Sequence, residues 1–176
     1  MEIINPARCR LHTDSFFILV DRAAYAGFVA EEWTMQTLQA HVADQGALGR
    51  ITGASLGPFL QDLPVEVRGD RSARASTREV ATVVQVHGEG LHVVDYTELT
   101  MAAQFEGRDG VQAPETHARV HLPPGRYRVV FRQLRSEADV DEPGFWESEE
   151  PALEVVVEPA DEQVAPLGSG FAWFEV

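Results

Sequence analysis

The sequence predicts a mainly β protein, an antiparallel β-sandwich with one main α-helix in the N-terminal third. The first observation is the period-two pattern of residues 80–86, which is typical of a strand with one buried face. The second is a pair of turn sequences at 87–90 and 123–125, which predict hairpins spanning 80–94 and 117–131. The third is that turns rather than helices separate the expected strands, which favours antiparallel pairing.

The N-terminal third contains the expected first strand and the helix. Residues 11–21, around the apolar run at 16–20, predict a first buried strand. The helix is expected near residues 30–45, because Glu31 and Glu32 suit the positive end of a helix dipole. Its apolar side is expected to consist of Trp33, Met35, Leu38 and Val42.

The remaining segments complete a pattern of about nine strands. Residues 63–68 predict a short strand, and the Arg- and Ser-rich residues 69–78 predict an exposed loop. Residues 153–157 alternate and residues 171–176 are rich in aromatic side chains, so both indicate strands. The C-terminal portion is therefore expected to be folded.

The length of 176 residues fits one domain, expected over residues 1–176. No apolar run reaches the roughly 18 residues of a membrane span, and residues 1–6 lack the pattern of a signal peptide. The single cysteine, Cys9, has no partner for an internal disulfide. These features lead us to expect a cytoplasmic protein.

The charge of the chain is strongly negative and unevenly placed. The net charge is −14, and all 14 basic residues are arginine. Residues 1–135 hold 16 acids and 14 bases, whereas residues 136–176 hold 12 acids and no base. Such a charge repels nucleic acid and anionic membranes and attracts a basic partner. We therefore expect a basic protein partner, with no direct binding of nucleic acid and no membrane contact.

Residues 137–150 are the candidate partner-binding segment, because they combine acids with two central aromatic residues. Interface energy concentrates in aromatic anchors, while charges at the rim govern the association rate. The alternative is that the aromatic residues pack inward and the acids only solubilise the loop. The predicted partner-binding residues are Glu137, Asp139, Asp141, Glu142, Phe145, Trp146, Glu147, Glu149 and Glu150.

One motif suggests catalysis. Residues 53–57 match the G-x-S-x-G nucleophile elbow, with Asp95 and His117 following in the order of a serine hydrolase. That motif requires a strand, a sharp turn and a helix, whereas here Pro58 follows at once and no strong strand precedes it. We predict that Ser55 is not a nucleophile and that the chain is not an enzyme.

Metal and cofactor sites have little support in the sequence. His87, His92, His117 and His121 lie in or near expected strands, but no spacing typical of a metal site joins them. The tripeptide at 68–70 spells an adhesion motif by coincidence, since no secretion signal accompanies it. No glycine-rich phosphate loop is present. No cofactor and no metal are expected.

Several motifs, taken in order, resemble the ComJ family of competence-associated nuclease inhibitors, over roughly residues 11–134. They are the strand at 16–20 followed by Trp33 and Thr34, residues 43–47 followed by Ile51, residues 90–93, and the Leu-Pro-x-Gly-x-Tyr pattern at 122–127 continuing to Val129. The resemblance implies a cytoplasmic protein without enzymatic activity that binds and blocks a bacterial nuclease, either a DNA-entry nuclease or a secreted nuclease toxin. The chain departs from the family by a longer stretch at 95–116 and a larger acidic C-terminal portion, at 136–176.

Two other classes of function are also compatible with the sequence. One is a β-sandwich that binds a small ligand or a carbohydrate, with Trp33, Trp146 or Trp173 as a platform. The other is a serine hydrolase at Ser55, which would need a histidine within hydrogen-bond reach of the hydroxyl group.

Overall fold

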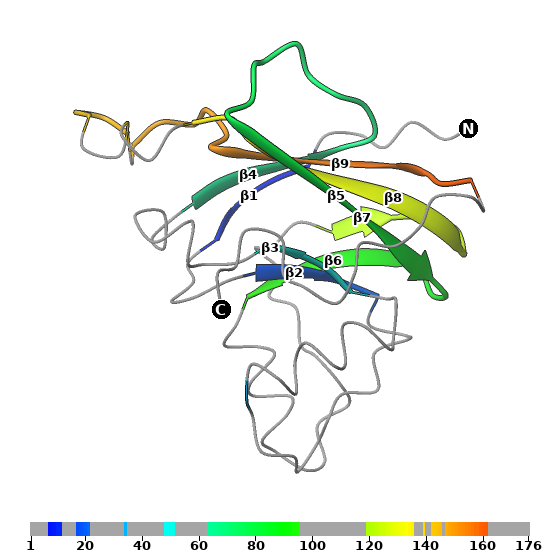
Figure 1. Ribbon diagram of the computed structural model, residues 1–176. Helices are drawn as coiled ribbons and strands as arrows, with labels where there is room; N and C mark the ends of the chain where they lie inside the picture. The colour runs from blue at the N-terminus through cyan, green and yellow to red at the C-terminus, as the bar shows by residue number, and fades with distance from the viewer. Residues whose placement is uncertain are drawn as a thin grey trace.

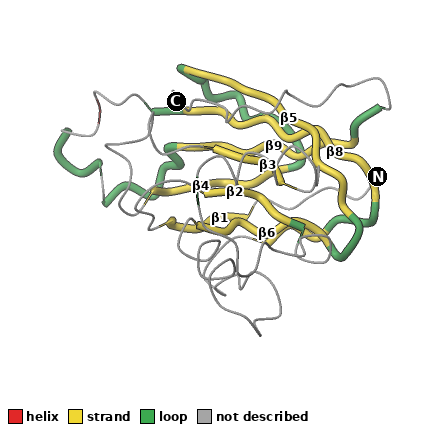
Figure 2. Tube along the Cα trace, turned by 60° about the horizontal axis from the view of Figure 1, so that its bottom comes forward, coloured by secondary structure: helices red, strands yellow, loops and turns green. Residues whose placement is uncertain are grey.

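The computed structural model describes residues 7–11, 17–21, 34, 48–51, 63–95, 119–135, 139, 142–145 and 147–161. Within these residues the regular elements with defined bounds are nine β-strands (Figures 1 and 2). They are β1 (Ala7–Leu11), β2 (Phe17–Val20), β3 (Leu48–Ile51), β4 (Leu63–Arg68), β5 (Arg78–Val86), β6 (Gly90–Asp95), β7 (Arg119–His121), β8 (Gly125–Gln133) and β9 (Leu153–Pro159). The mainly β prediction is confirmed. The helix expected near residues 30–45 lies outside the described residues.

The strands form two sheets, a larger one in the order β1-β4-β9-β8-β5 and a smaller one in the order β3-β2-β6-β7. Every described pair is antiparallel except β4 with β9, which run parallel with Val65 opposite Leu153. The expectation of purely antiparallel sheets is therefore wrong at this pair. Parallel neighbours need a long connection, and β5 to β8 all lie between β4 and β9 along the chain.

Neither predicted hairpin forms, although both turns do. The turn at residues 87–89 leads from β5 in the larger sheet to β6 in the smaller one, and residues 122–124 lead from β7 back to β8 in the larger sheet. Alternation and turn sequence identify a strand and its end, but they do not identify the neighbour with which the strand pairs. Both turns therefore connect the two sheets, one above the other in Figure 1.

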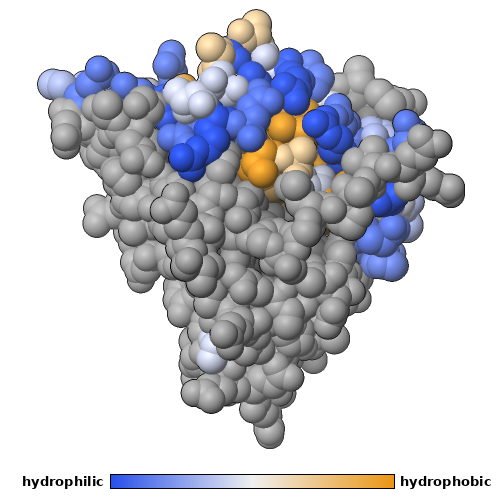
Figure 3. Space-filling model, in the orientation of Figure 1, coloured by the Kyte–Doolittle hydropathy of each residue, from blue (hydrophilic) through white to orange (hydrophobic). Residues whose placement is uncertain are grey.

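One apolar cluster lies between the sheets. The larger sheet contributes alternate residues such as Val65, Val155 and Phe131, and the smaller sheet contributes Leu19 and Val93. The intervening residues of the larger sheet lie on its opposite face, which we call the outer face. In the view of Figure 3, hydrophilic side chains surround a small apolar area on the described part of the surface. The alternation therefore places an apolar core between the sheets, while the outer face carries charged residues together with the buried side chains of Val83, Val130 and Val156.

One carboxylate and one hydroxyl group hold the turns between the sheets in place. The Asp21 carboxylate, which is 1% exposed, accepts hydrogen bonds from the backbone N–H groups of His87 and Gly88. The Tyr127 hydroxyl donates to the Pro123 carbonyl oxygen at 2.9 Å. Burial raises the pKa of Tyr127, so this hydroxyl keeps its proton at neutral pH.

Gly90 is required where the first turn meets β7. Its φ is +137°, and an added Cβ would lie 1.9 Å from the Val120 carbonyl oxygen. We predict that Gly90→Ala lowers the free energy of unfolding by about 3 kcal/mol or more, because steric overlap adds to backbone strain. Urea unfolding measures the loss.

Gly144→Ala is the matched control for this variant. Gly144 also has a positive φ, +81°, but nothing lies within 4 Å of its added Cβ. Backbone strain alone should then cost about 1–2 kcal/mol. Equal losses in the two variants would contradict the close approach of Gly90 to β7.

Candidate functional site

The described acids of the candidate segment lie at the surface. Glu142, Glu147, Glu149 and Glu150 are exposed, and Asp139 is half-buried. Glu137, Asp141 and Trp146 lie outside the described residues, so their expected role stays a prediction. We call residues 139–150 the acidic segment.

Backbone hydrogen bonds fold the acidic segment into successive turns. The Glu142 N–H donates to the Asp139 carbonyl oxygen at 3.0 Å, and the Phe145 N–H donates to the Glu142 carbonyl oxygen at 3.1 Å. The Ser148 N–H then donates to the Phe145 carbonyl oxygen at 3.3 Å. These bonds hold Glu142 and Glu147 in a defined conformation.

Phe145 anchors the segment in the core rather than facing a partner. Its side chain is 1% exposed and belongs to the apolar cluster between the sheets. The Arg135 guanidinium lies 3.8 Å from the ring centroid, at the distance of a cation–π contact. The expectation that this ring contacts a partner does not fit its position, because the ring is buried in the core. Burial of such a large aromatic side chain stabilises the fold.

Arg10 of β1 holds the far end of the acidic segment against the larger sheet. Its Nη2 donates to the Ser148 carbonyl oxygen at 2.7 Å and lies 3.3 Å from Glu149 Oε1. Four residues after Ser148, the Ala152 N–H donates to the Pro64 carbonyl oxygen at 2.9 Å and leads the chain into β9. The segment is therefore attached at two points, through the side chain of Phe145 and through the contact of Arg10 with Ser148.

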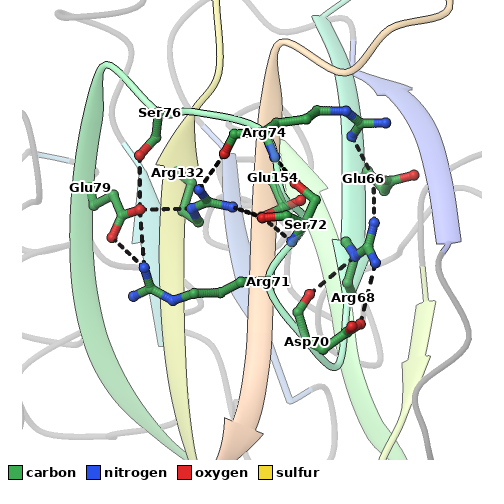
Figure 4. Close-up of polar contacts among 10 residues, drawn as sticks. All are labelled: Glu66, Arg68, Asp70, Arg71, Ser72, Arg74, Ser76, Glu79, Arg132 and Glu154. Atoms are coloured by element: carbon green, nitrogen blue, oxygen red, sulfur yellow. Dashed lines mark hydrogen bonds and ion pairs between the residues drawn. The ribbon is translucent and has the colours of Figure 1, made fainter.

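A row of charged side chains crosses the outer face of the larger sheet, and Figure 4 shows all of it except Arg8. The strand register places one charged residue of each strand opposite the next. We call these residues the charged row: Arg8, Glu66, Glu154, Arg132 and Glu79.

Ion pairs link the residues of the charged row. Arg8 Nε donates to Glu66 Oε1 at 2.8 Å, and Arg132 binds both Glu154 and Glu79. The side chains of Glu66, Arg132 and Glu154 are 3%, 6% and 0% exposed. Among the described residues, Glu154 Oε2 is the buried side-chain atom without a hydrogen-bond partner. The row is thus a buried charged network at the centre and reaches solvent at its two ends.

The loop at 69–77 closes over the row. Arg74 Nη1 donates to Glu66 Oε2 at 2.9 Å, Arg71 pairs with Glu79 at 2.9 Å, and the Ser72 N–H donates to Glu154 Oε1 at 3.3 Å. Arg68 likewise pairs with Asp70, so the tripeptide at 68–70 does not present free charges. These arginines neutralise carboxylates within the chain, which differs from an unpaired basic surface that binds phosphates.

The arginines also set the acidity of the row. Hydrogen bonds from Arg132, Ser76 and Arg71 lower the pKa of Glu79 to about 2. Burial alone would raise the pKa of Glu66, but hydrogen bonds from Arg8 and Arg74 outweigh it and lower that pKa. Both carboxylates are therefore ionised at neutral pH and stabilise the folded state in that form.

Sequence reasoning did not identify the charged row. Its signal is present as a charged residue between apolar ones at 65–67 and 153–155, and as Arg132 between Phe131 and Gln133. Each segment alone predicts only an outward-facing polar position. Their alignment depends on the pairing of β4 with β9 and of β9 with β8, which no local pattern reveals.

The residues that the sequence offers for the alternative hydrolase, ligand platform or metal site are described only in part. Ser55, His117, Trp33 and Trp173 lie outside the described residues. His87 and His121 are exposed. Among the described residues no group of three potential ligands could hold a metal ion, and no described helix is long and apolar enough to cross a membrane.

Comparison with known proteins identifies the fold. No protein-family model and no curated protein matches the chain. Two solved structures are similar. One is described as crocagin biosynthetic gene J; it is 13% identical, has a TM-score of 0.53, and the match covers 92% of this chain and 100% of that one. The other is ComJ from Bacillus subtilis, described as an inhibitor of the DNA-degrading activity of NucA; it is 11% identical, has a TM-score of 0.46, and the match covers 90% of this chain and 98% of that one. ComJ is thus among the solved structures to which this chain is similar. The likeness to the first structure, at 13% identity, shows a similar fold and not an activity.

The pH dependence of stability tests the charged row. The folded pKa values of Glu79 and Glu66 lie below the unfolded value of 4.5, so their stabilisation is present above pH 4.5 and is lost as the pH falls toward 2. We predict that the stability difference between wild type and Glu79→Gln shrinks over this range. Urea unfolding at several pH values measures it.

Gln85→Ala serves as the control on the same strand, because it changes no titratable group. Its stability difference from wild type should stay constant from pH 4.5 to 2. A constant difference for Glu79→Gln as well would show that the ion pairs of Glu79 do not stabilise the fold.

Proposed function

We propose that this chain is an acidic inhibitor that binds and blocks a bacterial nuclease, either a DNA-entry nuclease or a secreted nuclease toxin. In this proposal it is a single cytoplasmic domain, its two sheets pack as a sandwich, and it acts without enzymatic activity or a cofactor. The observation that carries the proposal is the set of exposed acids on a segment that Phe145 and Arg10 attach to the fold at two points.

The chemistry of a nuclease explains why such a segment would bind it. A nuclease must attract a polyanion, so the surface around its active site is basic. Complementary charge steers two proteins together and suppresses the binding of wrong partners. An acidic segment can therefore occupy the surface that DNA would use.

The fixed conformation of the segment adds to this argument. Ordering a flexible loop on binding costs free energy, which lowers affinity. Here the core contact of Phe145 and the hydrogen bond from Arg10 to Ser148 order the chain before any partner arrives. The sequence motifs that resemble ComJ support the same function.

A nuclease protection assay tests the proposal. The purified chain is mixed with NucA, and separately with nucleases encoded beside its own gene, and the degradation of plasmid DNA is followed. We expect stoichiometric inhibition of one of these nucleases. If the chain protects the plasmid by binding the DNA itself and not the nuclease, the proposal is contradicted.

Charge variants locate the surface. The triple variant Glu142→Gln, Glu147→Gln, Glu150→Gln should lower the association rate constant with the inhibited nuclease roughly tenfold at low salt and reduce its salt dependence, since exposed charges mainly steer association. Surface plasmon resonance at several salt concentrations measures both quantities.

The control variant carries the same change of net charge elsewhere. It is the triple variant Glu89→Gln, Glu158→Gln, Asp161→Asn, whose three positions lie outside the acidic segment. Because net charge is matched, any difference between the variants reports the position of the charges. Equal association rates in the two variants would exclude the acidic segment as the interface.

A further inference from the structure

A half-open pocket lies between the edge strand β1, the start of β4 and the acidic segment. Its volume is about 200 Å³. It is lined by Pro64, Pro151 and Val65, of which Val65 is 1% exposed and packs in the core, and Arg8, Arg10 and Glu149 bring charged groups to it. Because Glu149 belongs to the acidic segment, the pocket is continuous with the surface of the proposed function.

The two arginines of the pocket differ in how they are used. Arg10 is bound to Ser148 and Glu149. Arg8 makes its contact to the described residues through Nε, which donates to Glu66, and its side chain is 55% exposed. The remaining face of the Arg8 guanidinium can therefore receive a group that enters the pocket.

The composition of the pocket selects a flat apolar group. Proline and valine walls offer no hydrogen bonds to a small polar ligand, and the two guanidinium groups disfavour a cation. The exposed carboxylate of Glu149 disfavours an anion. An aromatic ring satisfies all of these conditions, because it packs on apolar walls and stacks on a guanidinium plane.

We propose that this pocket anchors an aromatic side chain of a basic protein partner, an inference that rests on the proposed function. Interfaces concentrate their energy in aromatic residues that fill a pocket and are surrounded by polar groups. The acids at 142, 147, 149 and 150 supply such surroundings and match a basic surface. The partner is therefore a basic protein that presents Trp, Tyr or Phe beside its basic residues.

Small probes test the pocket without any nuclease. Indole, acetate and n-butylammonium are titrated separately into the labelled full chain, and the backbone amide signals of Cys9, Arg10 and Glu149 are followed by NMR. We expect indole to shift these signals with saturation, and the two ions to leave them unchanged. Saturable shifts with acetate or n-butylammonium instead would overturn the aromatic assignment, and so would the absence of any shift with indole.

Arg8→Ala and Arg119→Ala form the matched pair of variants. Arg119 is also a partly exposed, ion-paired arginine, but it lies on β7 of the smaller sheet. Arg8→Ala should raise the dissociation constant for indole about two- to fivefold, the range of an exposed cation–π contact. Arg119→Ala should leave it unchanged, and equal effects of the two variants would overturn the role of Arg8.

The probe titration and the nuclease assay fail independently. Arg8-dependent indole binding without inhibition of any nuclease would overturn the proposed function and leave the aromatic pocket in place. Inhibition by a chain that does not bind indole would overturn the pocket and leave the nuclease inhibitor in place.

Discussion

The buried ion pairs of Arg132 are the interaction on which the larger sheet depends. The side chain of Arg132 is 6% exposed and lies between Glu79 of β5 and Glu154 of β9. A buried charge is tolerated only when partners surround it. A slip of either neighbouring strand by one residue would turn a charged side chain into the core and leave Arg132 unpaired. The ion pairs therefore fix the register of β5, β8 and β9 together.

The same network couples the sheet to the surface. Through Ser72, Arg71 and Arg74 it holds the loop at 69–77 across the outer face, and through Glu66 it reaches Arg8 on the edge strand. Two residues along β1, Arg10 holds the acidic segment. The position of the segment thus follows from the register of a sheet whose central charges are buried.

Local patterns in the sequence identified most of the described strands, but not β1 (Ala7–Leu11), and they did not identify the partners of the strands. Alternation correctly predicted strands at 80–86 and 126–131, because it reports which face of a strand is buried. It could not show that β5 pairs with β8 and that β6 pairs with β2, since pairing is decided by the packing of distant segments. The acids of the candidate segment were visible as composition. The inward direction of Phe145 and the pocket beside Arg10 were not, because both depend on tertiary contacts.

The distribution of the arginines explains how a chain with ordinary charge content presents a negative surface. Four arginines form ion pairs with carboxylates on the outer face of the larger sheet. They are Arg8, Arg71, Arg74 and Arg132, and their partners are Glu66, Glu79 and Glu154. Within the described part of the chain, Glu142, Glu147 and Glu150 take part in no such ion pair, so their charges act on the solvent. Charge at such a rim speeds the encounter with a basic protein and disfavours an acidic one. All basic proteins share this attraction, so charge alone does not choose among them. Discrimination requires a contact that depends on shape, and the pocket beside Arg8 offers one next to the acids.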